Sequence, residues 1–87
     1  MNVVEWLKER HFIILESDGL HHRIRTSSCE MRREAMRLKR ALEAEGVVLW
    51  SPHEKHRRAW LTATLDVSTN RAWLLLVINE EVLGLTA

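Results

Sequence analysis

The chain has 87 residues, of which 46% are hydrophobic and 29% are charged, and its formal net charge is +1 at pH 7. This length predicts a single domain over 1–87 with a modest core, and this composition excludes an intrinsically disordered chain. A lone cysteine excludes an internal disulfide and a four-cysteine zinc site, so a disulfide-stapled secreted domain is not expected. The longest apolar run, 72–78, is too short to cross a bilayer, and the charged N-terminus lacks the apolar run of a signal peptide. We therefore expect a cytoplasmic protein that contacts no membrane.

The first third of the sequence predicts a short helix followed by a β-hairpin. Asn2 and Glu5 have the spacing of a capping box, and apolar residues recur at helical spacing over about 3–10. Residues 12–15 are an apolar run typical of a strand, and the Asp-Gly pair that follows indicates a hairpin turn. We therefore expect residues 20–26 to form the returning strand.

The middle of the sequence predicts a long amphipathic helix over 28–45. Ser27 and Glu30 have the spacing of a second capping box, and Gly46 is expected to end the helix in the left-handed conformation that glycine tolerates. The apolar stripe of this helix, which is expected to face a sheet, consists of Met31, Ala35, Leu38 and Leu42. The helix therefore supplies a large part of the expected core.

The second half of the sequence predicts three antiparallel strands, over 47–50, 58–66 and 71–78. Residues 58–66 alternate in polarity with a period of two, which is typical of a half-buried strand. A proline and a glutamate within 52–57 also fit the start of a helix, but the alternation that follows favours a turn there. The expected fold is a single α+β domain with the order αββαβββ, in which the long central helix and the short N-terminal helix pack on a mostly antiparallel sheet.

Basic residues concentrate in the middle of the sequence. Residues 19–40 contain seven basic and two acidic side chains, which gives this segment a net charge of +5. The expected basic set consists of His21, Arg23 and Arg25 on the strand and of Arg32, Arg33, Arg37 and Arg40 on the helix. Because almost no loop separates strand from helix, the two sets could form one surface for the phosphates of DNA or RNA. The first hypothesis is thus a non-catalytic regulatory module that binds nucleic acid; the other interpretation of these residues is a solvated face without a ligand.

The last predicted hairpin has apolar residues on both faces, and this gives a second hypothesis. With a four-residue loop over 67–70, Trp73 lies opposite Thr64, and leucines and alanines make up one face. The other face contains Trp60, Trp73, Leu75 and Val77 among threonines. Two helices, one on each face of the sheet, would cover both faces. Alternatively, the tryptophan face binds a protein partner or a second copy of the chain, as in a small inhibitor or regulator of the mobile-element type.

The segment Gly19, Leu20, His21 and His22 resembles the Gly-Ser-His-His segment of the HicA-type RNA-cleaving toxins, which are small double-stranded-RNA-binding-like domains. The resemblance covers about the first quarter of the chain, and it implies RNA cleavage with His21 as the catalytic residue. The sequence departs from that family at Leu20, which replaces the serine. It departs again in the long helix that follows, where the family has a third strand.

The rest of the sequence gives no positive indication of catalysis. The three glycines do not form a phosphate-binding loop, and Ser27 and Ser28 are expected to cap the helix rather than to act as nucleophiles. His53 and His56 have a His-x-x-His spacing, but the basic residues around them would repel a metal ion. We therefore expect no cofactor and no metal.

Overall fold

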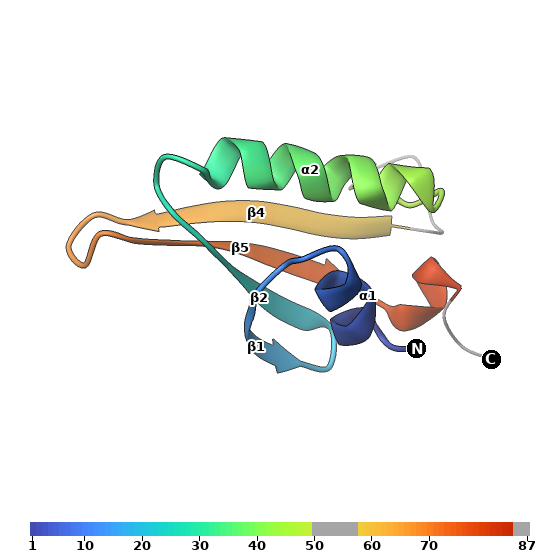
Figure 1. Ribbon diagram of the computed structural model, residues 1–87. Helices are drawn as coiled ribbons and strands as arrows, with labels where there is room; N and C mark the ends of the chain where they lie inside the picture. Colours follow the sequence, from blue (N-terminus) through green and yellow to red (C-terminus); the bar gives the residue numbers. More distant parts are fainter. Residues whose placement is uncertain (50–57, 85–87) are drawn as a thin grey trace.

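Two α-helices, five strands and one short 3-10 helix follow one another in the computed structural model, which describes residues 1–49 and 58–84 (Figure 1). In chain order they are α1 (Val3–Glu9), β1 (Ile14–Asp18), β2 (His21–Thr26), α2 (Met31–Ala44), β3 (Val48–Leu49), β4 (Arg58–Asp66), β5 (Arg71–Ile78) and η1 (Glu80–Leu83). The α+β class and the order αββαβββ are therefore confirmed. Trp50 and the predicted turn over 52–57 lie outside the described residues. No helix of the described ranges is long and apolar enough to cross a membrane.

The five strands form one mixed sheet in the order β1-β2-β5-β4-β3. β5 pairs antiparallel with β2 on one side and with β4 on the other, and Trp73 lies opposite Thr64. This register confirms the four-residue loop over 67–70. The prediction of a third antiparallel strand after the central helix is wrong, because β3 is only two residues long and runs parallel to β4. The reason is the path of the chain, since α2 ends near the end of the sheet where β4 begins (Figure 1).

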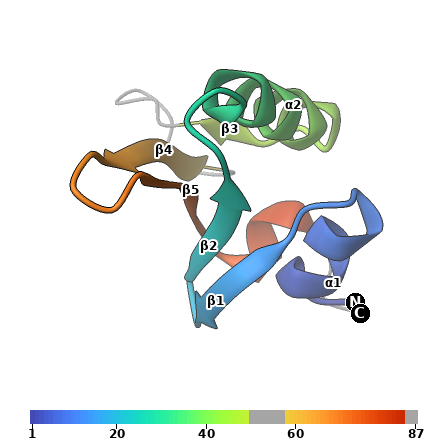
Figure 2. The ribbon, with the colours of Figure 1, turned by 60° about the vertical axis from the view of Figure 1, so that its left-hand side comes forward.

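Both helices lie on the same face of the sheet (Figure 2), and the core fills the space between them and that face. Its buried members from the helices and from alternate strand positions include Val3, Trp6, Leu7, Ile24, Leu38, Leu42, Leu74 and Leu76. Met31 and Ala35 are partly buried and pack against this core, so the predicted stripe of the central helix is confirmed. The expectation of one helix on each face is wrong. The covered face is mostly aliphatic, whereas the other mixes tryptophan with threonine, arginine and histidine, which tolerate contact with water.

The central helix begins at Met31, later than predicted. The Ser27 hydroxyl accepts a hydrogen bond from the Glu30 amide at 3.3 Å, and the same amide donates to the Ser27 carbonyl at 3.1 Å. These bonds stabilise a turn ahead of the helix instead of a capping box. The predicted end is confirmed, because Gly46 has a φ of 78° and the amide after it donates to the Leu42 carbonyl at 3.0 Å.

The first strand also begins later than the sequence indicates. Asn2 caps α1 as predicted, since its side-chain oxygen accepts a hydrogen bond from the Glu5 amide at 2.9 Å. His11 then adopts a left-handed conformation with a φ of 66°, and Phe12 turns into the core instead of entering the strand. β1 therefore begins at Ile14.

Candidate functional site

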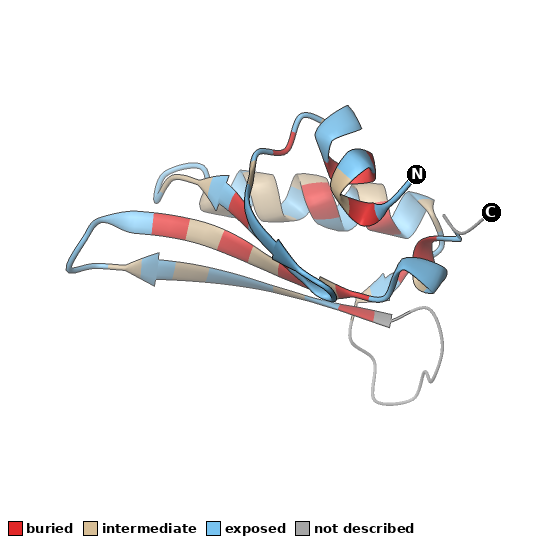
Figure 3. Cartoon of the chain, turned by 90° about the horizontal axis from the view of Figure 1, so that it is seen from below, coloured by how far each residue is buried: buried red, intermediate tan, exposed pale blue. Residues whose placement is uncertain are grey.

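The face of the sheet opposite the helices has no helix over it in the described part of the chain, and we call it the open face. Its side chains are those of Glu16 and Asp18 from β1, of His21, Arg23 and Arg25 from β2, of Trp60, Thr62, Thr64 and Asp66 from β4, and of Arg71, Trp73, Leu75 and Val77 from β5. Along β5, buried residues of the covered face alternate with half-buried residues of the open face (Figure 3). Trp60 exposes 42% of its surface, so the open face offers aromatic surface to solvent.

Trp73 lies near the middle of the open face, and an arginine lies over its ring. The Arg23 guanidinium is 5.1 Å from the centre of the Trp73 ring, and one of its nitrogens is 3.6 Å from a carboxylate oxygen of Glu16. A guanidinium at this distance from an indole forms a cation–π pair. The side chain of Arg23 is half exposed, so the pair presents a planar group to solvent.

Arg25 lies beside the Arg23–Trp73 pair and has no charge partner among the described residues. It is directly opposite Trp73 on β5, and on its other side its amide donates to the Ile13 carbonyl at 2.8 Å. Both neighbouring strand positions are therefore occupied by uncharged residues. Within the described ranges, the side chain of Arg25 forms no ion pair.

Arg71 is a second arginine of the open face without an ion pair in the described part of the chain, and the sequence analysis missed it. It lies opposite Asp66, which would be its natural partner. The Asp66 carboxylate instead accepts hydrogen bonds from the Ser68 amide at 3.1 Å and from the Ser68 hydroxyl at 2.7 Å. Hydrogen bonds from Ser68 and Thr69 lower the pKa of Asp66. The Asp-x-Ser spacing after β4 was the signal that this aspartate would turn into the loop and leave Arg71 unpaired.

A pocket of about 530 Å³ lies where β2 ends and β5 begins, and we call it the arginine pocket. Arg23, Arg25, Arg71 and Trp73 all line it. Three guanidinium groups and one indole ring thus border a single hollow. Such a combination attracts an anion that also has a planar or apolar part.

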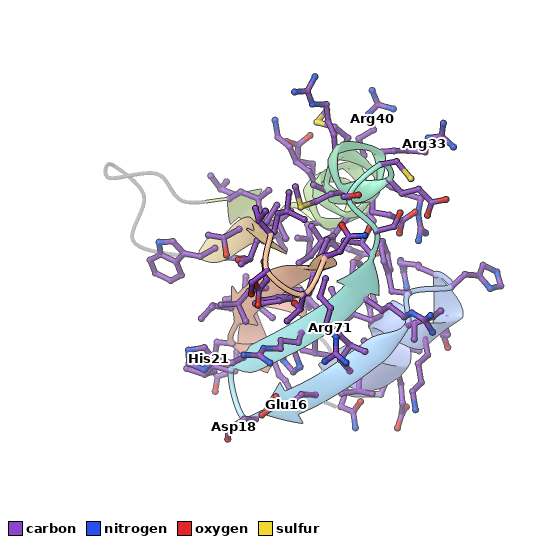
Figure 4. All side chains as sticks on the ribbon, turned by 90° about the vertical axis from the view of Figure 1, so that its left-hand side faces the viewer. Glu16, Asp18, His21, Arg33, Arg40 and Arg71 are labelled. Carbon is purple, nitrogen blue, oxygen red and sulfur yellow. The ribbon has the colours of Figure 1, made fainter. Side chains whose placement is uncertain are left out.

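The other end of the open face, at the turn between β1 and β2, is mixed in charge. His21 is exposed and lies opposite Asp18, and both border a hollow of about 210 Å³ together with Glu16. Figure 4 shows these three side chains at this end of the sheet. The resemblance to HicA-type toxins assigns a catalytic role to His21, but α2 rather than a third strand follows β2, so the order of elements departs from that family. Among the described residues, no three His, Cys, Asp or Glu side chains are grouped so as to hold a metal ion.

The arginines of α2 do not extend the open face. Arg33 and Arg40 project from α2 into solvent, away from the sheet (Figure 4), and Arg32 is exposed as well. Because α2 lies on the covered face, the sheet separates Arg33 and Arg40 from the arginines of β2. The structure therefore brings Arg23 and Arg25 together with Arg71, and not with the helix set.

Arg37, the fourth arginine of α2, is part of the packing. Its guanidinium lies 3.7 Å from the centre of the Phe12 ring and 2.9 Å from a carboxylate oxygen of Glu34, and it donates a hydrogen bond to the Arg10 carbonyl. These contacts connect α2 with the segment that joins α1 to β1. Arg37 thus stabilises the fold and is not offered to a ligand.

His22 is buried on the covered face, because it alternates along β2 with the exposed His21 and Arg23. Its Nδ1 lies 2.9 Å from the Ser17 hydroxyl, and its Nε2 has no hydrogen-bond partner in the described part of the chain. Burial lowers the pKa of His22 below its ordinary value of 6.5, although the negative charge of Glu80 opposes this shift. The neutral imidazole is therefore a core residue.

No protein-family model, curated protein or solved structure matches this chain. What the open face can bind therefore follows from its own side chains. It offers a stacked guanidinium and indole, two arginines without an ion pair in the described ranges, and threonine hydroxyls on the neighbouring strand. These groups suit a ligand that is both anionic and planar.

Proposed function

We propose that this domain is a non-catalytic binding module that holds a single strand of nucleic acid against the open face. The observation that carries this proposal is the Arg23–Trp73 pair on a sheet face that no described helix covers, beside two arginines that have no ion pair in the described ranges. The binding surface is narrower than the one that the sequence indicates, because it includes the arginines of β2 but not those of α2. Arg71 of β5 joins it instead.

The stacked pair supplies the contact with a base. Bases of single strands stack on aromatic rings and on guanidinium planes, and each such stack is worth about 1–3 kcal/mol. The Arg23 guanidinium is suited to this use, since it lies over the Trp73 ring and its side chain is half exposed. Trp60, on the neighbouring strand, provides a further exposed ring.

The arginines supply the contact with phosphate. Arg25 and Arg71 border the same pocket, and neither guanidinium is neutralised by a carboxylate in the described part of the chain. An unpaired guanidinium binds phosphate oxygens through two parallel N–H donors. The gain in free energy comes largely from counterions released from the nucleic acid, so the affinity depends on salt.

A single strand fits this surface better than a duplex. In a duplex the bases are stacked on one another and cannot reach an aromatic ring on a sheet, whereas single strands can splay their bases onto it. A surface for a duplex needs basic groups spread along the backbone. Here Arg33 and Arg40, two of the four arginines of α2, project from the helix away from the sheet (Figure 4).

The test is the binding of fluorescent DNA and RNA oligonucleotides, measured by anisotropy as a function of salt. We expect the wild type to bind single strands more tightly than duplexes, and the double variant Arg25→Gln, Arg71→Gln to bind more weakly. The slope of log affinity against log salt should be shallower by about 1.4 in this variant, since each phosphate contact with a single strand contributes about 0.7.

The matched control is the double variant Arg33→Gln, Arg40→Gln, which removes the same charge from the far side of α2. We expect it to keep the affinity and the salt slope of the wild type. Equal losses in the two double variants would show that net charge and not the open face attracts the strand. An absence of binding at low salt would overturn the proposal.

A second measurement distinguishes nucleic-acid binding from self-association. Trp60, Leu75 and Val77 form an apolar part of the open face that a second copy of the chain would also cover. Sedimentation of the wild type shows whether the protein is a monomer or a dimer, and so tests whether a second copy covers this surface. A dimer that dissociates on Trp60→Ala, in a protein that binds no oligonucleotide, would assign the open face to self-association and refute nucleic-acid binding.

A further inference from the structure

We infer that the arginine pocket takes the terminal phosphomonoester of a nucleic-acid strand, so that the domain recognises one end of that strand. The identity of the ligand rests on the proposed function, whereas the preference for a terminal phosphate rests on the pocket itself. Its volume of about 530 Å³ lies within the range of about 300–1,000 Å³ that is typical of ligand pockets. It is large enough for a nucleotide unit and not only for an ion.

The position of the pocket favours the end of a strand. It lies at the end of β2 and the start of β5, and residues outside the two strands, Ser27 and Ser28 on one side and Asn70 on the other, form part of its wall. A nucleic-acid strand that follows the open face from the Trp60 side therefore reaches the end of β2 at this point. A terminal group can stop there, whereas a continuing backbone would have to leave the sheet.

The charges of the pocket suit a dianion. A terminal phosphomonoester has a charge of about −1.5 to −2 at neutral pH, because its second pKa is about 6, whereas an internal phosphodiester has a single negative charge. Arg25 and Arg71 each contribute one positive charge that no carboxylate in the described ranges balances. Arg23 is partly neutralised by Glu16 and remains available for stacking.

A serine also contributes to the wall of the pocket. Ser28 is exposed and lines the hollow together with Arg25 and Arg71. Its hydroxyl can donate a hydrogen bond to a phosphate oxygen.

The experiment compares one oligonucleotide sequence in three forms, with a 5′-phosphate, with a 3′-phosphate and with hydroxyl groups at both ends. We expect one of the two phosphorylated forms to bind roughly tenfold more tightly than the other two, since two guanidiniums would gain charge-assisted hydrogen bonds. Arg71→Gln should abolish this preference, and Arg33→Gln should leave it unchanged. The preference should also shrink below about pH 6, where the phosphomonoester loses its second charge.

The outcomes separate this inference from the proposed function. Equal affinity for all three forms would overturn the terminal-phosphate site and leave binding along the open face intact. An equal gain from a phosphate at either end would show a general effect of charge and would likewise overturn it. Binding of a nucleoside monophosphate that depends on Arg71, in a protein that binds no oligonucleotide, would support the pocket and refute the proposed function.

Discussion

The guanidinium of Arg37 lies 3.7 Å from the centre of the Phe12 ring, whereas that of Arg25 has only uncharged neighbours on the adjacent strands. Arg33 projects into solvent. Three arginines of one basic segment thus have three different environments. The sequence could place Arg23 and Arg25 on one face, since side chains along a strand alternate with a period of two. It could not separate Arg37 from Arg33, because the partners of Arg37 come from a segment that only the tertiary fold brings close.

His22 gives a prediction at the same scale. Because burial lowers its pKa, the unfolded chain takes up a proton below about pH 6.5 that the folded domain does not bind. The free energy of unfolding should therefore fall as the pH is lowered through this range and should be unaffected by His22 above it. Urea denaturation between about pH 5 and pH 8 measures this.

The control for His22 is its neighbour His21, which is exposed on the open face. His22→Leu should remove part of the loss of stability in acid, and His21→Gln should retain all of it. An unchanged dependence on pH in His22→Leu would mean that the imidazole is protonated in the folded domain, where Glu80 would then stabilise the charge.

At the scale of the elements, α2 and the β4–β5 hairpin were the parts that the sequence predicted best. Both have strong periodicity, of 3.6 residues in the helix and of two in β4, and a clear terminator in Gly46 or in the loop over 67–70. The start of α2 and the position of Phe12 were predicted wrongly, because local hydrogen bonds and core packing decide them. The direction of β3 depends on where α2 ends in space, which no local pattern reports.

α2 also gives a prediction on stability. Leu38 is completely buried between α2 and the sheet, so Leu38→Ala should lower the free energy of unfolding by about 2–5 kcal/mol. Met36 on the same helix exposes 40% of its surface, and Met36→Ala should change the free energy of unfolding by about 0.5 kcal/mol or less. Denaturant titration of both variants measures the difference. Equal effects would mean that the stripe with Leu38 does not face the core.

At the scale of the whole molecule, the placement of both helices on one face leaves the open face available for a ligand. The sequence showed that the β4–β5 hairpin has two faces and which residues lie on each. It left open which face the helices cover, because both helices are amphipathic and either face contains apolar residues. The structure answers this question, because one core buries Trp6 of α1 and Leu38 of α2 together with Leu74 and Leu76 of β5.

Two tryptophans on opposite sides of the sheet test this arrangement. Trp60→Ala should retain the circular dichroism of the wild type and lower the free energy of unfolding by about 1 kcal/mol or less, while oligonucleotide affinity falls about fivefold or more. Trp6→Ala, the same substitution in the core, should cost about 3–5 kcal/mol of stability. A Trp60→Ala variant that unfolds like Trp6→Ala would show that the open face is covered in solution.

The shortness of β3 has a consequence for how this protein behaves in concentrated solution. Within the described residues, β3 pairs with β4 at Arg58 and Ala59, and no other described strand lies on that side, so the backbone of β4 from Leu61 onward forms an edge of the described sheet. The sequence there, Leu-Thr-Ala-Thr-Leu, is uncharged, rich in strand-forming residues and free of proline and glycine. One chain can therefore add to another edge to edge through β4. β1, at the opposite edge, is protected by a bulge and by the charges of Glu16 and Asp18, so association should use the β4 edge alone. Pairing of the same edge in two copies closes on itself, so concentrated solutions should contain dimers and not open-ended fibres.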